Sequence, residues 1–266
     1  MLTLFIFACQ SEPPVVSGAV NLPVSAPTFQ APPWPKEGVV VDSPMPLSSC
    51  LDKVPSCACY QENEEELCVP QFISEVKTLP HLLEESIRMH TWEEGCPIPL
   101  EDLRLLRVLH WTEDSKIRWG EIILTQRVVR SAQKVFSELY IQQFPVHSIK
   151  PAFEYEGSDE ASMADNNTSA FNCRKIRGTN NWSEHAYGEA IDINPLWNPW
   201  VKGAKVLPKN AQQFVDRDIP RPGLISQGSS VILAFEEQGW QWGSQKKGIK
   251  DYQHFSRKDH SETYEN

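Results

Sequence analysis

Two short motifs, far apart in the chain, carry side chains that make chemical sense only if the fold brings them together. Residues 183–192 read Ser-Glu-His-Ala-Tyr-Gly-Glu-Ala-Ile-Asp and fit the pattern SxHxxGxAxD, and residues 251–255 read Asp-Tyr-Gln-His-Phe. The five specified positions of the first motif match by chance in a chain of this length with a probability of roughly one in ten thousand. The match is therefore a strong signal, and we expect the fold to place these two segments side by side.

His185, Asp192 and His254 form a donor set typical of catalytic zinc. Such sites take three protein ligands from His, Asp, Glu or Cys and leave a fourth position for water. Two imidazoles and one carboxylate leave the ion with a net positive charge, which lowers the pKa of bound water from about 15.7 toward roughly 7. The sequence therefore predicts Zn²⁺ as the cofactor. Asp251 lies three residues before His254, close enough to converge on it from a helical turn or a bent loop, and is the predicted general base.

The residues between His185 and Asp192 favour a turn and a strand over a continuous helix. Gly188 interrupts a helix, and residues 191–193, Ile-Asp-Ile, alternate as a half-buried strand does. The dipeptide Asn-Pro at 194–195 then ends that strand.

Apolar patterns in the rest of the C-terminal part predict an α+β domain. Two strands are expected over 103–111 and 117–124, with a hairpin-like break between them. Apolar residues recur at helical spacing from 128 to 140, a second helix is expected from about 229 to 238, and Trp240 and Trp242 alternate on a following strand. We expect the metal residues on a small antiparallel sheet covered by helices, with the loop 198–228 forming a wall or lid.

The two motifs resemble those of bacterial cell-wall zinc peptidases, namely the VanY-type D-alanyl-D-alanine carboxypeptidases and their L-alanyl-D-glutamate endopeptidase relatives. The similarity runs from about 100 to 256 and includes the segments 162–174, 182–199 and 239–243. It implies a Hedgehog/D,D-peptidase-like fold. By position, it also implies that His185, Asp192 and His254 are the zinc ligands, that Asp251 is the catalytic acid, and that Arg174 contacts substrate and stabilises the transition state.

Two features leave the cleaved bond open. The carboxypeptidase branch of the family typically has Glu as the acid and Trp before the last His, whereas Asp251 and Gln253 are similar to the endopeptidase branch. Both a D,D-carboxypeptidase and an L-Ala-D-Glu-type endopeptidase are therefore compatible with the motifs.

Amide hydrolysis also requires a group such as Arg174 on chemical grounds. Attack on a carbonyl builds negative charge on its oxygen, and a fixed donor aimed at that charge is often worth about 10² to 10³ in rate. The alternative is a surface arginine paired with an acid.

The N-terminal part differs in composition from the rest of the chain. Residues 1–9 suit the end of a signal peptide with a possible lipobox at Cys9, although no basic residue precedes the apolar run. Residues 10–49 are rich in proline and read as a linker. We expect a Cys-rich segment over 50–98, the zinc peptidase domain over 99–258 and a tail over 259–266.

Apart from Cys9, the chain has six cysteines, an even number that can form three bridges in an oxidising compartment. Sequence alone does not give their connectivity. Two alternatives stay open: a second zinc site in the Cys-rich segment, and a free buried thiol at Cys173.

The formal charge of −10 argues against nucleic acid as a partner, because phosphate binding needs clustered Lys and Arg. We therefore expect a monomeric zinc metallopeptidase of the bacterial cell envelope, periplasmic or anchored as an outer-membrane lipoprotein, that acts on peptidoglycan peptides. A lipid on the N-terminus would be the only link to a membrane. The alternatives are a catalytically inactive, zinc-containing module, as in the resembling Hedgehog signalling domains, and a structural envelope lipoprotein that binds a partner through its Cys-rich segment.

Overall fold

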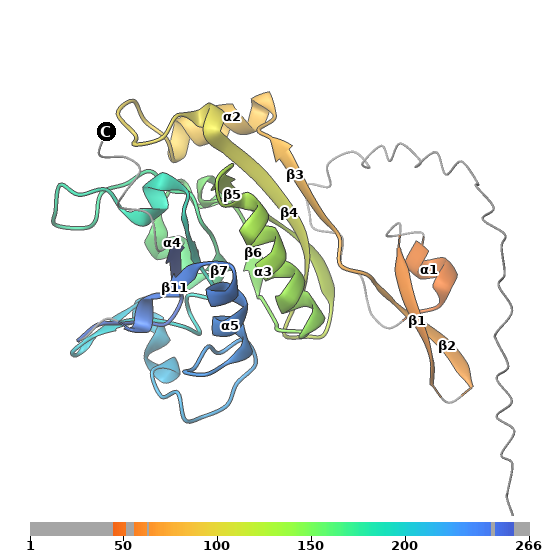
Figure 1. The fold of residues 1–266 in the computed structure, drawn as a ribbon. Coiled ribbons are helices and arrows are strands. Elements are labelled where there is room, and N and C mark those ends of the chain that lie inside the picture. The colour runs from red at the N-terminus through yellow and green to blue at the C-terminus, as the bar shows by residue number, and fades with distance from the viewer. Residues whose placement is uncertain (1–44, 52–55, 63, 246–247, 258–266) are drawn as a thin grey trace, which may run out of the picture. The chain divides into compact units, whose positions relative to one another are not determined.

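The computed structural model describes residues 45–51, 56–62, 64–245 and 248–257 (Figure 1). The chain divides into two units, 1–36 and 37–266, and all described residues belong to the second. The predicted signal-peptide remnant at 1–9, most of the predicted linker at 10–49 and the predicted tail at 259–266 lie outside the described residues. Within the described ranges, none of the helices combines the length and the apolar character that crossing a bilayer requires.

A three-stranded antiparallel sheet forms the base of the domain. It has the order β3-β4-β5, with β3 at Ser74–Thr78, β4 at Leu103–Trp111 and β5 at Ile117–Thr125. The two strands predicted around 103–124 are thereby confirmed. β4 is buried along almost its whole length because apolar clusters cover both faces of the sheet, with Leu106 in one cluster and Leu105 in the other. β3 comes from the predicted Cys-rich segment, yet it forms the edge of this sheet.

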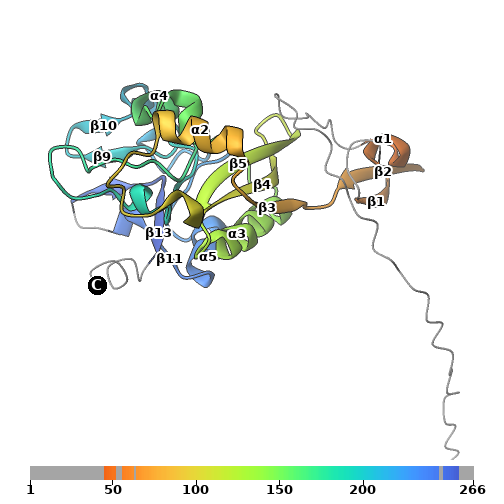
Figure 2. The same cartoon turned by 90° about the horizontal axis from the view of Figure 1, so that it is seen from above.

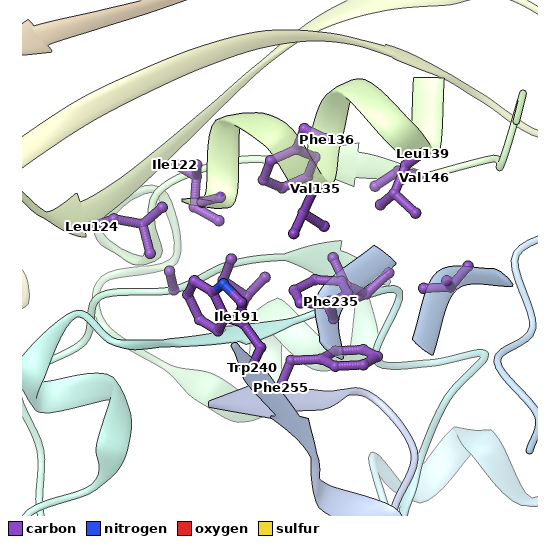
Figure 3. Packing of buried hydrophobic residues seen from close by; sticks show 14 of the residues in the cluster. Ile122, Leu124, Val135, Phe136, Leu139, Val146, Ile191, Phe235, Trp240 and Phe255 are labelled. Atoms are coloured by element: carbon purple, nitrogen blue, oxygen red, sulfur yellow. The ribbon is translucent and has the colours of Figure 1, made fainter. Parts of the chain in front are cut away.

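The helix α3 (Val129–Ile141) covers one face of that sheet (Figure 2). Its buried residues recur at the spacing of one helical face, as the sequence predicts, and include Val135 and Phe136. Figure 3 shows these two side chains beside Ile122 and Leu124 of β5, facing a second layer that contains Trp240, Phe235 and Phe255. Phe235 and Phe255 stack with ring centroids 3.8 Å apart. The main core therefore lies directly against the layer that carries the predicted metal ligands.

This second layer is a small antiparallel sheet of order β11-β13-β8, as predicted. It consists of β11 (Trp240–Trp242), β13 (His254–Arg257) and β8 (Ala190–Asp192). The predicted second helix is α5 (Ser230–Glu237), which ends just before Gly239, a residue in the left-handed region at φ 82°. The predicted α+β class is confirmed.

The segment 198–228 is more ordered than the loop that the sequence predicts. It contains the hairpin of β9 (Trp200–Lys202) and β10 (Lys205–Leu207), joined through Gly203, and β9 pairs with β12 (Lys250–Asp251) to give the order β10-β9-β12. Arg217 holds the rest of the segment 198–228 in place. Its guanidinium donates to Asn198 Oδ1 at 2.6 Å and to the carbonyl oxygen of Ile225 at 2.5 Å. The prediction that this segment is a loop is wrong, because short strands and buried polar contacts tie it down, whereas its predicted role as a wall or lid stays a prediction.

The other elements are short. They are α1 (Leu47–Leu51), β1 (Cys57–Glu62), β2 (Glu65–Pro70), α2 (His81–His90), β6 (Ser148–Ile149), α4 (Asp159–Ala164) and β7 (Asn167–Thr168), with 3₁₀ turns at η1 (Leu100–Asp102), η2 (Ala152–Tyr155), η3 (Glu184–Tyr187), η4 (Lys209–Phe214) and η5 (Gly243–Gln245). β1 and β2 form an antiparallel hairpin, and β6 and β7 pair in parallel.

All six cysteines outside Cys9 are paired in disulfides. Cys50 bonds Cys57 and Cys59 bonds Cys68, so the hairpin of β1 and β2 is cross-linked twice. Cys96 bonds Cys173 across 77 positions of sequence. The prediction of three bridges is confirmed. The alternatives of a second zinc site and of a free thiol at Cys173 are wrong, because each candidate sulfur is already bonded.

Removing the long-range disulfide should destabilise the domain. Because the bridge between Cys96 and Cys173 closes a large loop, the double variant Cys96→Ala/Cys173→Ala is expected to lose about 2 to 4 kcal/mol of unfolding free energy. Urea unfolding of the full chain measures this loss. Cys50→Ala/Cys57→Ala, which opens a loop of only 7 positions, serves as the matched control and should cost less. Equal losses in the two variants would contradict the expectation.

Candidate metal centre

The centre is built on one pair of residues that face each other across two strands. His254 of β13 lies opposite Asp192 of β8 in the antiparallel register, so both side chains emerge on the same face of the sheet. His185 reaches the same place from the turn η3. One ligand-type atom from each of the three residues lies within 4.8 Å of the others. The structure thus brings the three predicted ligands together.

The other specified residues of the first motif shape the turn that carries His185. The Ser183 hydroxyl caps η3 by accepting from the His185 backbone N–H at 3.3 Å. This contact gives Ser183 a structural role. Gly188 ends the turn in the left-handed region at φ 62°, where an added Cβ would lie 3.0 Å from the backbone nitrogen of Thr125. A side chain here would be strained and crowded, which explains the motif's glycine.

Hydrogen bonds hold the two imidazoles in different orientations. His185 Nδ1 lies 2.6 Å from the carbonyl oxygen of Ala170, and its Nε2 lies 3.3 Å from Asp192 Oδ2. His254 faces Asp192 with its other nitrogen, Nδ1, at 3.0 Å from Oδ1. Its Nε2 lies 2.7 Å from Glu184 Oε2. A carbonyl oxygen can only accept, so His185 carries its proton on Nδ1 and presents the Nε2 lone pair to the centre.

The electrostatics of the cluster favour a bound cation. Burial alone would raise the pKa of Asp192, but the charges and hydrogen bonds of His185 and His254 hold it far below its usual range. Burial would lower the pKa of His254, yet its bonds to Asp192 and Glu184 raise it well above the usual value. Two imidazole nitrogens and one ionised carboxylate, all largely buried, are a donor set that Zn²⁺ accepts. The residues therefore fit the metal that the sequence predicts.

Asp251, the predicted general base, lies beside this cluster. β12 positions it, since Asp251 pairs with Trp200 of β9. Burial raises the pKa of its carboxyl to about 6, and Asp192 adds to this effect while His254 and His185 oppose it. Its Oδ1 atom is buried and has no hydrogen-bond partner within the part of the chain that the structure describes. A buried acceptor of this kind is available to take a proton.

Gly243 permits the close approach of the base and the ligand. A Cβ atom at this position would lie 3.0 Å from the Asp251 Cβ and 3.1 Å from the His254 Cβ. Both neighbours are attached directly to the backbone and cannot swing away. A side chain at 243 would therefore require Asp251 or His254 to give way by a few tenths of an ångström.

The structure places Arg174 next to the centre along the backbone, with its side chain in an ion pair. The Ser183 N–H donates to the Arg174 carbonyl oxygen at 3.0 Å, so the two chain segments run together. The guanidinium Nε contacts Asp159 Oδ2, and Asn172 donates to the other oxygen of that carboxylate at 2.9 Å. Arg174 thus has the acidic partner that the alternative interpretation expects. Its side chain is also 35% exposed, which leaves it accessible from solvent.

The remaining histidines lie apart from the ligand cluster. Burial lowers the pKa of His110 to about 4, and His147 Nδ1 lies 2.6 Å from Glu113 Oε1. His81 and His90 are exposed on α2, and His260 lies outside the described residues. Within the described ranges, His185, Asp192 and His254 are the one group of three such side chains close enough to share a metal ion.

Two partners of the ligands, Glu184 and the carbonyl oxygen of Ala170, were not predicted from the sequence. Glu184 is an unspecified position of the motif and immediately precedes His185. The rule that a ligating histidine donates its second ring nitrogen to a carboxylate or a carbonyl could have directed attention to it.

Comparison with known protein families finds a match that covers the site. Residues 177–257 match the family model described as D-alanyl-D-alanine carboxypeptidase. The match includes the turn η3 and all three strands of the small sheet, and it begins after Arg174. Neither a curated protein nor a solved structure shows significant similarity to the chain. The match supports a hydrolase of the peptidase type, and the resemblance to the D-alanyl-D-alanine carboxypeptidase family is confirmed over residues 177–257.

Proposed function

We propose that this protein is a zinc-dependent peptidase that hydrolyses an amide bond in the stem peptides of peptidoglycan. The observation that carries the proposal is the convergence of His185, Asp192 and His254 beside the buried carboxyl of Asp251. The segment that matches the family model contains all four residues. Peptide hydrolysis needs an electrophilic centre and a base of moderate pKa. The three ligand residues would hold the electrophilic metal, and Asp251 is the base.

The residues divide the work as follows. When bound by His185, Asp192 and His254, zinc would supply a Lewis acid and lower the pKa of a coordinated water. Asp251 takes the proton of the attacking water on its free carboxylate oxygen and returns it to the leaving amine. Arg174 donates to the carbonyl oxygen as negative charge develops there. For this last role, the arginine must share its guanidinium between Asp159 and substrate.

Arg174→Ala tests this role. Loss of a donor to the developing oxyanion is expected to lower kcat by about 10² to 10³, with zinc affinity unchanged, since Arg174 contacts none of the three ligand side chains. Steady-state kinetics together with metal titration measure both quantities. The matched control is Arg177→Ala, an exposed arginine three positions along the chain, which should retain full activity. An Arg174→Ala variant with unchanged kcat would leave the arginine a purely structural partner of Asp159.

The substrate is tested directly by incubating the zinc-loaded full chain with isolated peptidoglycan and identifying the products by mass spectrometry. Release of terminal D-alanine would identify a D,D-carboxypeptidase, and cleavage within the stem an endopeptidase. Asp251 and Gln253 favour the second outcome, because they are similar to the endopeptidase branch. Products no greater than those of an Asp251→Ala control would refute the proposal and favour a zinc-containing binding module.

The cellular setting is part of the proposal. Three disulfides suit an oxidising compartment, and peptidoglycan lies in the bacterial envelope, so we place the protein in the periplasm or on the outer membrane as a lipoprotein. Lipid at Cys9, detected by mass spectrometry of protein from membranes, would distinguish the anchored form. If the protein were instead a structural lipoprotein acting through its Cys-rich segment, the zinc-loaded full chain would release no products from peptidoglycan.

A further inference from the structure

Glu184 brings a second carboxylate to the ligand His254, at the ring nitrogen that Asp192 does not contact. Its Oε2 lies 2.7 Å from His254 Nε2, while Asp192 Oδ1 lies 3.0 Å from His254 Nδ1. The two ring nitrogens direct their bonds along diverging lines, so Glu184 lies behind the imidazole as seen from the ligand cluster. It accordingly does not belong to the group of residues that could share a metal ion.

We propose that Glu184 is a positioning residue that holds His254 in the Nε2–H tautomer, so that Nδ1 is the atom presented to zinc. This inference rests on the proposed function, because it concerns how a ligand is oriented toward the metal. An ionised carboxylate only accepts hydrogen bonds, so a 2.7 Å contact requires the proton to be on Nε2. Asp192 Oδ1, 3.0 Å from Nδ1, would accept from that nitrogen in the same way. With zinc bound in place of the Nδ1 proton, Glu184 would hold the remaining proton on Nε2 and leave the Nδ1 lone pair for the metal.

The arrangement of the two histidines supports this role. His185 is fixed in the opposite sense, since Ala170 accepts from its Nδ1 and leaves Nε2 for the centre. Each ligand ring therefore has one nitrogen held by an oxygen outside the cluster and the other nitrogen facing Asp192. The hydrogen-bond acceptor for His185 is a neutral carbonyl oxygen, whereas the acceptor for His254 is a charged carboxylate. The carboxylate both selects the tautomer and makes the ligating nitrogen a stronger donor.

The position of Glu184 in the chain couples the two rings. It is the first residue of η3 and immediately precedes His185, so a single turn supplies one ligand and the orienting partner of the other. Ser183 caps this turn and Gly188 ends it, which fixes the backbone between them. The Glu184 side chain is 34% exposed and that of His254 only 11%, so the hydrogen bond shields the back of the ring from water.

Zinc binding by the full chain tests the inference. Titration with Zn²⁺ against a chromophoric chelator should show affinity about 10 to 100-fold weaker for Glu184→Ala than for wild type. Glu184→Gln keeps an acceptor oxygen but lacks the charge, so it should lie between the two, roughly 3 to 10-fold below wild type. Glu160→Ala is the matched control, because this exposed glutamate has only a 3.4 Å surface pair with Lys209 and should bind zinc as wild type does.

A second readout separates positioning from a merely structural role. In the zinc-loaded wild type, correlation of ring nitrogens with ring protons by NMR should assign His254 as Nε2–H and His185 as Nδ1–H. In Glu184→Ala, the Nε2 proton of His254 should exchange faster with water, while the Nδ1 proton of His185, bonded to Ala170, should be unaffected.

The outcomes are distinct. Zinc affinity of Glu184→Ala within twofold of wild type, or a proton found on Nδ1 of His254, would overturn the inference and leave the proposed function intact. If Glu184→Ala does not fold, Glu184→Gln decides, because unchanged affinity in that variant would show that the charge has no effect. A wild-type protein that fails to bind zinc would refute the proposed function, and this inference with it.

Discussion

His185→Ala should abolish zinc binding and peptide hydrolysis together. His185 supplies one of three donors, its ring is buried, and no other histidine in the described part of the chain lies close enough to replace it. Loss of a direct ligand should weaken zinc binding by more than about 100-fold, the upper range for removal of an outer partner of a ligand. Elemental analysis of the dialysed protein and a chelator titration measure the change.

His147→Ala provides the control for this variant. That histidine pairs with Glu113 on the surface, outside the ligand cluster, so its removal should leave zinc content and activity unchanged. Full zinc content in His185→Ala would overturn the assignment of the ligands. Residual hydrolysis in preparations of His185→Ala, if detected, should also show whether a contaminating enzyme is present.

Asp251→Asn should separate catalysis from metal binding. The substitution preserves the shape of the side chain but removes the acceptor charge, and we expect kcat to fall by about 10² to 10⁴ while zinc affinity changes little. The matched control is Asp218→Asn, an exposed aspartate outside the cluster. An Asp251→Asn variant that retains wild-type kcat would assign the base to another residue.

The acid limb of the pH profile provides an independent check of this base. Burial raises the pKa of Asp251 from 3.8 to about 6, and only the deprotonated form can accept a proton. Hydrolysis by the wild type should therefore decline as pH falls through about 6, a higher value than an exposed aspartate would give. A profile that stays flat down to pH 4.5 would contradict this assignment.

The sequence predicts that His185 and Asp192 lie together because that information is local, and the structure brings His254 to the same place. His185 and Asp192 belong to one short motif, and the glycine and serine that shape their turn are part of the same pattern. The strands at 103–125 and the helix α3 could also be predicted, because their long apolar patterns reflect the burial of a whole face of each element.

Features that depend on distant contacts could not be predicted in the same way. The bridge of Cys96 to Cys173 occurs in only about three of the 15 connectivities that six cysteines allow, since the remaining four cysteines can pair in three ways. The pairing of Arg174 with Asp159 depends on how α4 lies beside the motif. The hairpin of β9 and β10 has a weak sequence signal, because residues 201–206, Val-Lys-Gly-Ala-Lys-Val, have apolar ends around a glycine turn. Strands of three residues carry too little periodicity to be predicted from it.

Gly243 shows how a position without a functional group can constrain evolution as tightly as a ligand does. Because a Cβ at this position would lie 3.0 Å from the Asp251 Cβ and 3.1 Å from the His254 Cβ, every other amino acid should shift one of these residues by a few tenths of an ångström. In a library of single substitutions selected for activity, position 243 should tolerate as few residues as 185 or 254. A sequence profile would then show this glycine as invariant, although all that it contributes is the absence of a side chain.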